Sequence, residues 1–254
     1  MSGFSAFLAK ELQEIRRTWR IWVIPGLLLF FAVASPLLAY LTPALVGSMI
    51  KSQPGVSVTL PPATWRDAYA QFLRNLSQIV VIAIVITGAG SVSGERATGT
   101  AVLTLVKPVS RASFVLAKVA SQWILVAASA ALGTVICAAL TRAIFGPAPV
   151  GQLVSAVLLW LAYALLLVIV MTLFSAWFPA RGAAAGAGLG FYFLTALAGI
   201  WAPLVRYSFV GLLPAAGKTL LGQSVATAWP LATTAIADVL CAAVAVRVFG
   251  RQEL

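Results

Sequence analysis

The stretch LVSAVLLWLAYALLLVIVMTLFSAWF, residues 153–178, decides the fold, because no charged side chain interrupts it. A helix of this length extends about 39 Å at about 1.5 Å per residue, whereas the hydrocarbon core of a bilayer is about 30 Å thick. An uncharged apolar run of this kind is typical of a membrane-spanning helix. Residues 153–178 therefore predict one such helix.

The composition of the whole chain agrees with this prediction. Of the 254 residues, 61% are apolar and 9% are charged, and the mean hydropathy is +1.01. Soluble domains average about 45–50% apolar and about 25% charged residues. A soluble fold of this length could not cover so much apolar surface with so little charge. We therefore expect an all-α integral membrane protein.

Six apolar runs are long enough to span a bilayer: residues 21–41, 76–93, 118–140, 153–178, 183–203 and 229–249. The links between them are too short for a separate soluble domain, so we expect a single transmembrane domain over residues 1–254. Residues 42–75 combine prolines with later aromatic side chains, which predicts an irregular outer loop followed by a short amphipathic helix on the outer interface. Residues 204–228 are apolar but broken by glycine and proline, which predicts a re-entrant outer segment before the sixth helix.

The leader, residues 1–20, carries apolar side chains at helical spacing: Phe4, Phe7, Leu8, Leu12, Ile15 and Trp19. This pattern predicts an amphipathic helix that lies on the membrane interface, with a solvated basic tail as the alternative. With both termini inside, eleven of the 17 basic residues fall on inner segments. That bias predicts cytoplasmic termini. The net charge of +11 then reflects topology and contact with anionic membrane lipid, with no nucleic acid partner.

Several kinds of chemistry are excluded by residue counts. The chain has no histidine and only six acidic residues, which excludes histidine-based catalysis and leaves little scope for a carboxylate metal cage. We expect no catalytic residue and no metal site. Cys137 and Cys241 lie inside apolar runs and are expected to be small buried hydrophobic residues. The twelve arginines against five lysines, with abundant alanine, are typical of a GC-rich bacterial genome.

The segment from Gly211 to Thr219 is similar to a phosphate-binding loop, but it has five residues between its glycines where that motif has four. It also follows no predicted strand and falls on the outer side. We therefore expect this chain to bind no nucleotide and no cofactor.

Two of the predicted spans carry residues that are unusual in a membrane helix: the fifth has regularly spaced glycines and the sixth has an aspartate. Gly182, Gly186 and Gly190 repeat at every fourth residue, a spacing that lets another helix approach closely, either within one bundle or in a dimer. Asp238 is the carboxylate within the last span, near the bilayer centre. An ionisable group there indicates a transport pathway or, alternatively, a hydrogen-bonded packing role.

The inner segment 94–117 is the most polar part of the body. Glycines permit turns, and residues 101–106 can form a short apolar helix that Pro108 ends; Ser110 can then cap the next helix. Such an element suits docking into a groove on a cytosolic partner, although an ordinary loop explains the residues equally well. The residues expected to couple to a partner are Glu95, Arg96, Gly99, Thr100, Pro108, Ser110 and Arg111.

At this segment the chain resembles the membrane subunits of bacterial ABC exporters of the second type. Glu95, the Gly99-Thr100 pair, Pro108-Val109-Ser110-Arg111 and Lys118 match the family pattern in place, and the topology corresponds along the whole chain. The long proline-rich first outer loop is a departure, because many members lack it.

The resemblance implies an export permease without ATPase activity of its own. Two such subunits, either two copies or a copy with a homologue, would pair with two cytosolic ATP-binding cassette subunits, which would bind ATP and magnesium. Residues 94–117 would hold the coupling helix, where Glu95 and Arg111 would transmit force. A stand-alone secondary transporter or channel is the alternative, and a membrane-embedded enzyme or assembly factor is a third interpretation. The substrate remains open.

Overall fold

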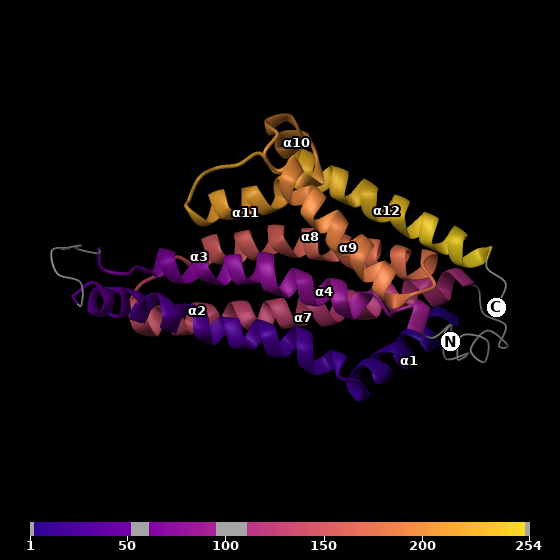
Figure 1. The fold of residues 1–254 in the computed structure, drawn as a ribbon, viewed down its shortest axis with the longest axis horizontal. Helices are drawn as coiled ribbons and strands as arrows, with labels where there is room; N and C mark the ends of the chain where they lie inside the picture. Colours follow the sequence, from indigo (N-terminus) through magenta and orange to yellow (C-terminus); the bar gives the residue numbers. More distant parts are fainter. Residues whose placement is uncertain (1–2, 52–60, 95–110, 252–254) are drawn as a thin grey trace.

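The computed structural model describes residues 3–51, 61–94 and 111–251, and in these ranges the chain is helical (Figure 1). Five helices are long and apolar enough to cross a membrane: Ile21–Gly47, Trp65–Gly88, Ala112–Phe145, Val150–Trp177 and Ala228–Gly250. The all-α membrane architecture is thus confirmed. The predicted fifth span became helix α9 (Arg181–Ala198), whose 18 residues extend about 27 Å, slightly less than a hydrocarbon core. The number six therefore stays a prediction.

The first two helices meet at a bend. Helix α1 (Gly3–Arg17) is followed after two residues by α2 (Arg20–Lys51), which continues well beyond the predicted end at residue 41. Three prolines, Pro25, Pro36 and Pro43, lie inside α2 without ending it. Membrane helices tolerate proline because neighbouring groups satisfy the freed backbone carbonyls.

The predicted outer interfacial helix exists, but its expected place was wrong. Helix α3 (Trp65–Asn75) continues through a π-turn (Leu76–Val80) into α4 (Val81–Gly88) as one span. Tyr69 and Phe72 are completely buried in the core that α3 shares with α2 and α7. The prediction took the aromatic side chains of this segment as interfacial, but two of them pack into the core. Asp67 in the first turn caps the helix, where its carboxylate accepts a hydrogen bond from the Thr64 backbone N–H at 2.8 Å.

Helix α8 (Val150–Trp177) is the centre of the bundle. It packs against α4, α7 (Arg111–Phe145), α9, α11 and α12, and Trp160 and Tyr163 on it are fully buried. Its most apolar window is 67% buried, against 11% for α12 (Ala228–Gly250). Helix α12 therefore exposes most of its surface on the outside of the bundle.

Residues 202–220 form three short helices: α10 (Ala202–Tyr207), a 3₁₀ turn (Phe209–Gly211) and α11 (Leu212–Leu220). Helix α11 buries Leu212, Ala216 and Leu220 and lies along α8 (Figure 1). The segment is broken as expected, while its re-entrant depth stays a prediction. Residues 212–220, which the similarity to a phosphate-binding loop covers, are helical and form α11.

Helix α1 and the terminal turns of three other helices lie together at one end of the bundle. Helix α1, the last turn of α4, the first turn of α7 and the last turn of α12 lie at the same end, opposite the start of α3 (Figure 1). The residues that flank the predicted coupling segment are therefore next to α1.

Candidate functional site

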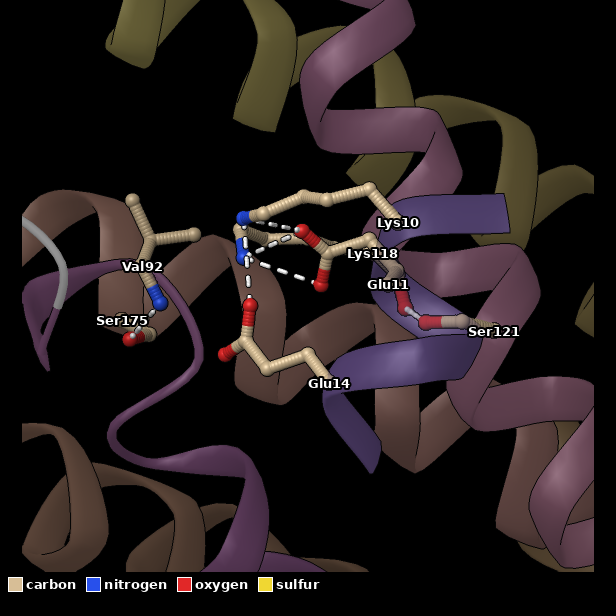
Figure 2. A network of polar contacts seen from close by, with 7 residues as sticks. All are labelled: Lys10, Glu11, Glu14, Val92, Lys118, Ser121 and Ser175. Atoms are coloured by element: carbon tan, nitrogen blue, oxygen red, sulfur yellow. Dashed lines mark hydrogen bonds and ion pairs between the residues drawn. The ribbon is translucent and has the colours of Figure 1, made fainter. Parts of the chain in front are cut away.

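A buried ion pair joins α1 to α7 at this end of the bundle. The Lys118 Nζ donates hydrogen bonds to Glu11 Oε1 at 3.0 Å and to Glu11 Oε2 at 3.1 Å. Glu11 is 3% exposed and Lys118 1% exposed. Figure 2 shows both side chains converging between the two helices. Removal of either partner would leave an uncompensated buried charge, which costs about 3–5 kcal/mol.

The apolar stripe of α1 positions Glu11. Phe7, Glu11 and Ile15 follow each other at intervals of four residues, so they share one face of the helix, and all three are buried. The ring of Phe7 packs edge-on against Phe114 of α7, with ring centroids 5.9 Å apart. Phe114 in turn stacks on Phe249 of α12 at 5.0 Å. These contacts bring α1, α7 and α12 into one small apolar cluster around the ion pair.

A second cation extends the network towards the surface. The Lys10 Nζ lies 3.3 Å from Glu11 Oε1 and 3.1 Å from Glu14 Oε2 (Figure 2). The Lys118 ammonium also lies 4.9 Å from the centroid of the Phe114 ring. The buried charge of Lys118 is thus balanced by a carboxylate and an aromatic face, an arrangement that holds α1 at one position on α7.

The turn that follows α4 is bound to α8 by a single serine. The Ser175 hydroxyl oxygen accepts hydrogen bonds from the backbone N–H groups of Val92 at 2.9 Å and Ser93 at 3.1 Å, and it donates to the Ala89 carbonyl at 2.8 Å. These backbone groups lie beyond the helix end, where they lack helical partners. Ser175 therefore fixes the last described residues before the predicted coupling segment.

Arginine 181, at the start of α9, covers the same turn. A Cβ atom placed on Gly94 would lie 2.8 Å from Arg181 Nη2, and one on Gly90 would lie 3.3 Å from Arg181 Cδ. Glycine at these two positions lets the guanidinium lie directly on the backbone. The turn after α4 is thus held by α8 on one side and by α9 on the other.

Most of the predicted coupling residues cannot be placed. Glu95, Arg96, Gly99, Thr100, Pro108 and Ser110 lie outside the described residues, and Arg111 is the first residue of α7. Of the family pattern, Lys118 is the member whose contacts are described, and its partner is Glu11. The structure therefore shows how both ends of the segment are anchored, and the role of the segment itself stays a prediction.

Sequence reasoning missed Glu11. A usable signal was present, because Glu11 interrupts the apolar stripe of the leader between Phe7 and Ile15. An acid on the buried face of an amphipathic helix calls for a basic partner on the helix beneath it. Lys118, alone at the start of a long apolar run, was the matching candidate.

The three regularly spaced glycines are exposed on α9. Within the described residues, a Cβ atom on Gly182, Gly186 or Gly190 would have no heavy atom within 4 Å. Close packing of α9 occurs instead at Gly188, beside Met171 and Val85. Asp238 is partly buried near the middle of α12. Neither its role nor a dimer face on α9 is tested by these contacts.

Both cysteines are free: Cys137 is buried, and Cys241 is partly buried. Among residues 3–51, 61–94 and 111–251, no three His, Cys, Asp or Glu side chains come close enough to hold a metal ion.

Comparison with known proteins identifies the family. The model of the ABC-2 family transporter protein matches residues 6–225. The chain belongs to this family. It is also 23% identical over 192 residues to the uncharacterized transmembrane protein YxlG of Bacillus subtilis, covering 75% of this chain and 74% of that protein. The expected resemblance is thereby confirmed.

Membership of the ABC-2 family indicates what kind of protein these contacts hold together. The chain is a multi-pass membrane protein and a membrane component of an ABC transporter. A component of this kind works with ATP-binding cassette subunits. Residues 95–110 lie between the two anchored ends, one held by Ser175 and the other next to the Glu11–Lys118 ion pair.

Proposed function

We propose that this ABC-2 protein is the permease of an ATP-driven exporter in the bacterial cytoplasmic membrane, with both termini in the cytoplasm. Two permease subunits, either two copies or a copy with a homologue, pair with two cytosolic subunits that bind ATP and magnesium. Residues 95–110 contain the helix that docks on those subunits. Family membership supports the transport role, and the direction of transport rests on the resemblance at the coupling segment.

The observation that carries the coupling proposal is the anchoring of both flanks of the segment. A docking helix transmits motion only if the structure behind it does not yield. On one side Ser175 binds the turn after α4 to α8, and on the other Lys118 binds the first turns of α7 to α1. A force applied to residues 95–110 therefore reaches α1, α4, α7 and α8 together. Glu11 and Lys118 act here as positioning residues.

The test is reconstitution with the ATP-binding subunit that co-purifies with the chain in mild detergent. The double variant Glu95→Ala, Arg111→Ala should lower transport-coupled ATP hydrolysis at least tenfold while the chain stays folded. Arg66→Ala is the matched control, because this exposed arginine belongs to the first turn of α3. The start of α3 lies at the opposite end of the bundle (Figure 1). Unchanged hydrolysis and transport in the double variant would contradict the coupling role.

A stand-alone secondary transporter remains the alternative, and the position of Asp238 near mid-span is the feature that favours it. Transport by the purified chain in vesicles, driven by an ion gradient without ATP or a partner, would establish this alternative. Accumulation only with ATP and the partner subunit supports the exporter.

A further inference from the structure

A polar pocket lies between α2 and α3, at the end of the bundle where α3 begins and opposite α1 (Figure 1). Its volume is about 450 Å³, within the range of about 300–1,000 Å³ that small-molecule sites occupy. Next to it, Asn75 Nδ2 donates to the Ser35 hydroxyl at 3.1 Å, a buried contact that ties the two helices together. The walls combine apolar, polar and charged residues, among them Leu38, Ala39, Thr42, Asp67, Gln71 and Arg74.

One part of the wall carries hydrogen-bond acceptors. The Asp67 carboxylate accepts two hydrogen bonds of 2.8 Å from Thr64, both through Oδ2, so Oδ1 has no partner among the described residues. Pro43 lies inside α2 and has no N–H, so the Ala39 carbonyl, four residues earlier, lacks its usual helical donor. Asp67, Ala39 and Pro43 all line the pocket. This part of the wall therefore suits a positively charged hydrogen-bond donor.

The opposite charge comes from Arg74, seven residues after Asp67 on the same face of α3. Arg74 is exposed, and within the part of the chain that the structure describes no ion pair joins it to a carboxylate. Side chains of an α-helix incline towards its N-terminus, so the guanidinium extends from Arg74 towards Gln71 and Asp67. A guanidinium binds a phosphate through two N–H groups at once. The pocket thus presents a cation and an anion to one ligand.

The depth of these two charges matches a bilayer surface. The span Trp65–Gly88 has 24 residues and extends about 36 Å, about 6 Å more than the hydrocarbon core. Asp67, in its first turn, therefore lies at the boundary of the hydrocarbon. Arg74 lies about 10 Å deeper along the helix, and its long side chain reaches back towards that boundary.

The surface of α2 beside the pocket can accommodate acyl chains. From the pocket towards the middle of the bilayer, α2 exposes Leu37, Val33 and Phe30 at helical spacing. The most apolar window of this helix is 33% buried, so most of its surface is open to lipid. A ligand with a zwitterionic head and apolar tails would therefore contact the pocket and this surface together.

We infer that the pocket between α2 and α3 binds the headgroup of a phospholipid with a primary ammonium, of the phosphatidylethanolamine class. Arg74 holds the phosphate, while Asp67 and the Ala39 carbonyl accept hydrogen bonds from the ammonium. A headgroup without a positive charge would leave the Asp67 carboxylate beside a phosphate of the same sign. A quaternary ammonium carries no N–H for either acceptor. The inference goes beyond the transport function, because binding requires neither ATP nor a partner.

The test is native mass spectrometry of the purified full chain in detergent. The chain is titrated with phosphatidylethanolamine, phosphatidylcholine and phosphatidylglycerol that have identical acyl chains. We expect phosphatidylethanolamine to bind at least tenfold more tightly than phosphatidylglycerol, and severalfold more tightly than phosphatidylcholine. Equal binding of the three lipids would overturn the inference.

Two variants test the charges. Arg74→Gln should weaken phosphatidylethanolamine binding at least tenfold. Arg66→Gln is the matched control and should change it less than twofold, because this arginine lies over the Trp65 ring and outside the pocket. Asp67→Asn keeps an acceptor for the Thr64 backbone N–H, so α3 stays capped, but the preference over phosphatidylglycerol should disappear. Unchanged binding in Arg74→Gln, or an unchanged preference in Asp67→Asn, would contradict the assigned roles.

A further pair of variants fills the pocket and leaves both charges in place. Thr42→Trp changes an exposed residue of the wall, so the chain should keep its thermal midpoint of unfolding and lose lipid binding. Leu41→Trp is the matched control, because this exposed neighbour does not line the pocket. Equal lipid binding by the two variants would show that the lipid binds elsewhere.

The source of the headgroup is tested with glycerophosphoethanolamine, which has the same phosphate and ammonium but no acyl chains. We expect it to compete with the lipid at least a hundredfold more weakly, because it makes no contact with the apolar surface of α2. Binding as tight as that of the lipid would make a soluble zwitterion the occupant and overturn the assignment to phospholipid.

Discussion

Breaking the Glu11–Lys118 ion pair should detach α1 from the bundle. The variant Lys118→Met keeps the length of the side chain but leaves the Glu11 carboxylate buried without its two hydrogen bonds of 3.0 and 3.1 Å. Such a change typically costs about 3–5 kcal/mol. Lys10 still lies 3.3 Å from Glu11, but its side chain is 39% exposed and compensates little. We therefore expect about 3 kcal/mol, or roughly a hundredfold shift in the docking of α1.

The assay is maleimide labelling of Ser121→Cys in a background without Cys137 and Cys241. Ser121 is 1% exposed and follows Lys118 by one turn on the same face of α7, so its labelling reports on the departure of α1. Labelling should accelerate by about two orders of magnitude in Lys118→Met. The control Lys10→Ala removes an exposed partner and should change the rate by less than about fivefold, because surface pairs contribute about 0–1 kcal/mol.

A double variant tests whether the unpaired carboxylate is the cause of the detachment. Glu11→Leu combined with Lys118→Met replaces the whole pair by apolar side chains inside an apolar cluster, so docking should return close to that of the unaltered chain. If Lys118→Met labels at the unaltered rate, or if the double variant labels as fast as the single one, the reasoning about an uncompensated buried carboxylate is refuted.

Three further changes test the packing around the site. Ser175→Ala should lower the thermal midpoint of unfolding in detergent, at a cost of about 1–3 kcal/mol, because two backbone N–H groups lose their acceptor. Gly188→Ala should destabilise the chain by a similar amount, because its Cβ would overlap the side chain of a buried methionine, whereas Gly186→Ala should be neutral. Ser35→Ala removes the hydrogen bond that Asn75 donates at 3.1 Å, and should cost about 0.6–2 kcal/mol by the same measurement.

For each of these three substitutions, one outcome would contradict the prediction. Thr172→Val is the control for the serine change, because the Thr172 hydroxyl only bonds a carbonyl of its own helix at 2.9 Å. Equal midpoints for Ser175→Ala and Thr172→Val would show that the turn after α4 does not depend on Ser175. Equal midpoints for the two glycine variants would contradict the assigned packing of α9. A Ser35→Ala chain as stable as the unaltered one would show that Asn75 finds another partner.

Sequence reasoning predicted the parts of this protein that depend on local composition. The apolar run 153–178 became α8, and the amphipathic leader became α1, because hydrophobicity and helical spacing act over one or two turns. The same reasoning misplaced residues 65–75, because their aromatic side chains were taken as interfacial, whereas Tyr69 and Phe72 are buried against other helices. Helix α9 proved shorter than the span expected over residues 183–203. Where a helix ends depends on contacts with neighbouring helices, and hydropathy along the chain carries no information about those contacts.

The sequence by itself determined that this is a membrane protein, because a soluble fold could not bury the side chains of 61% apolar residues. It also carried the family pattern in residues 95–118. Only the tertiary structure decided that Glu11 and Lys118, which are 107 positions apart, form a buried pair, and that Ser175 holds the turn after α4. Hydropathy is summed along the chain, whereas an ion pair forms only where packing of the helices brings two distant charges together. The anchoring of the residues that flank positions 95–110 is therefore a property of the packed helices rather than of any single stretch of sequence.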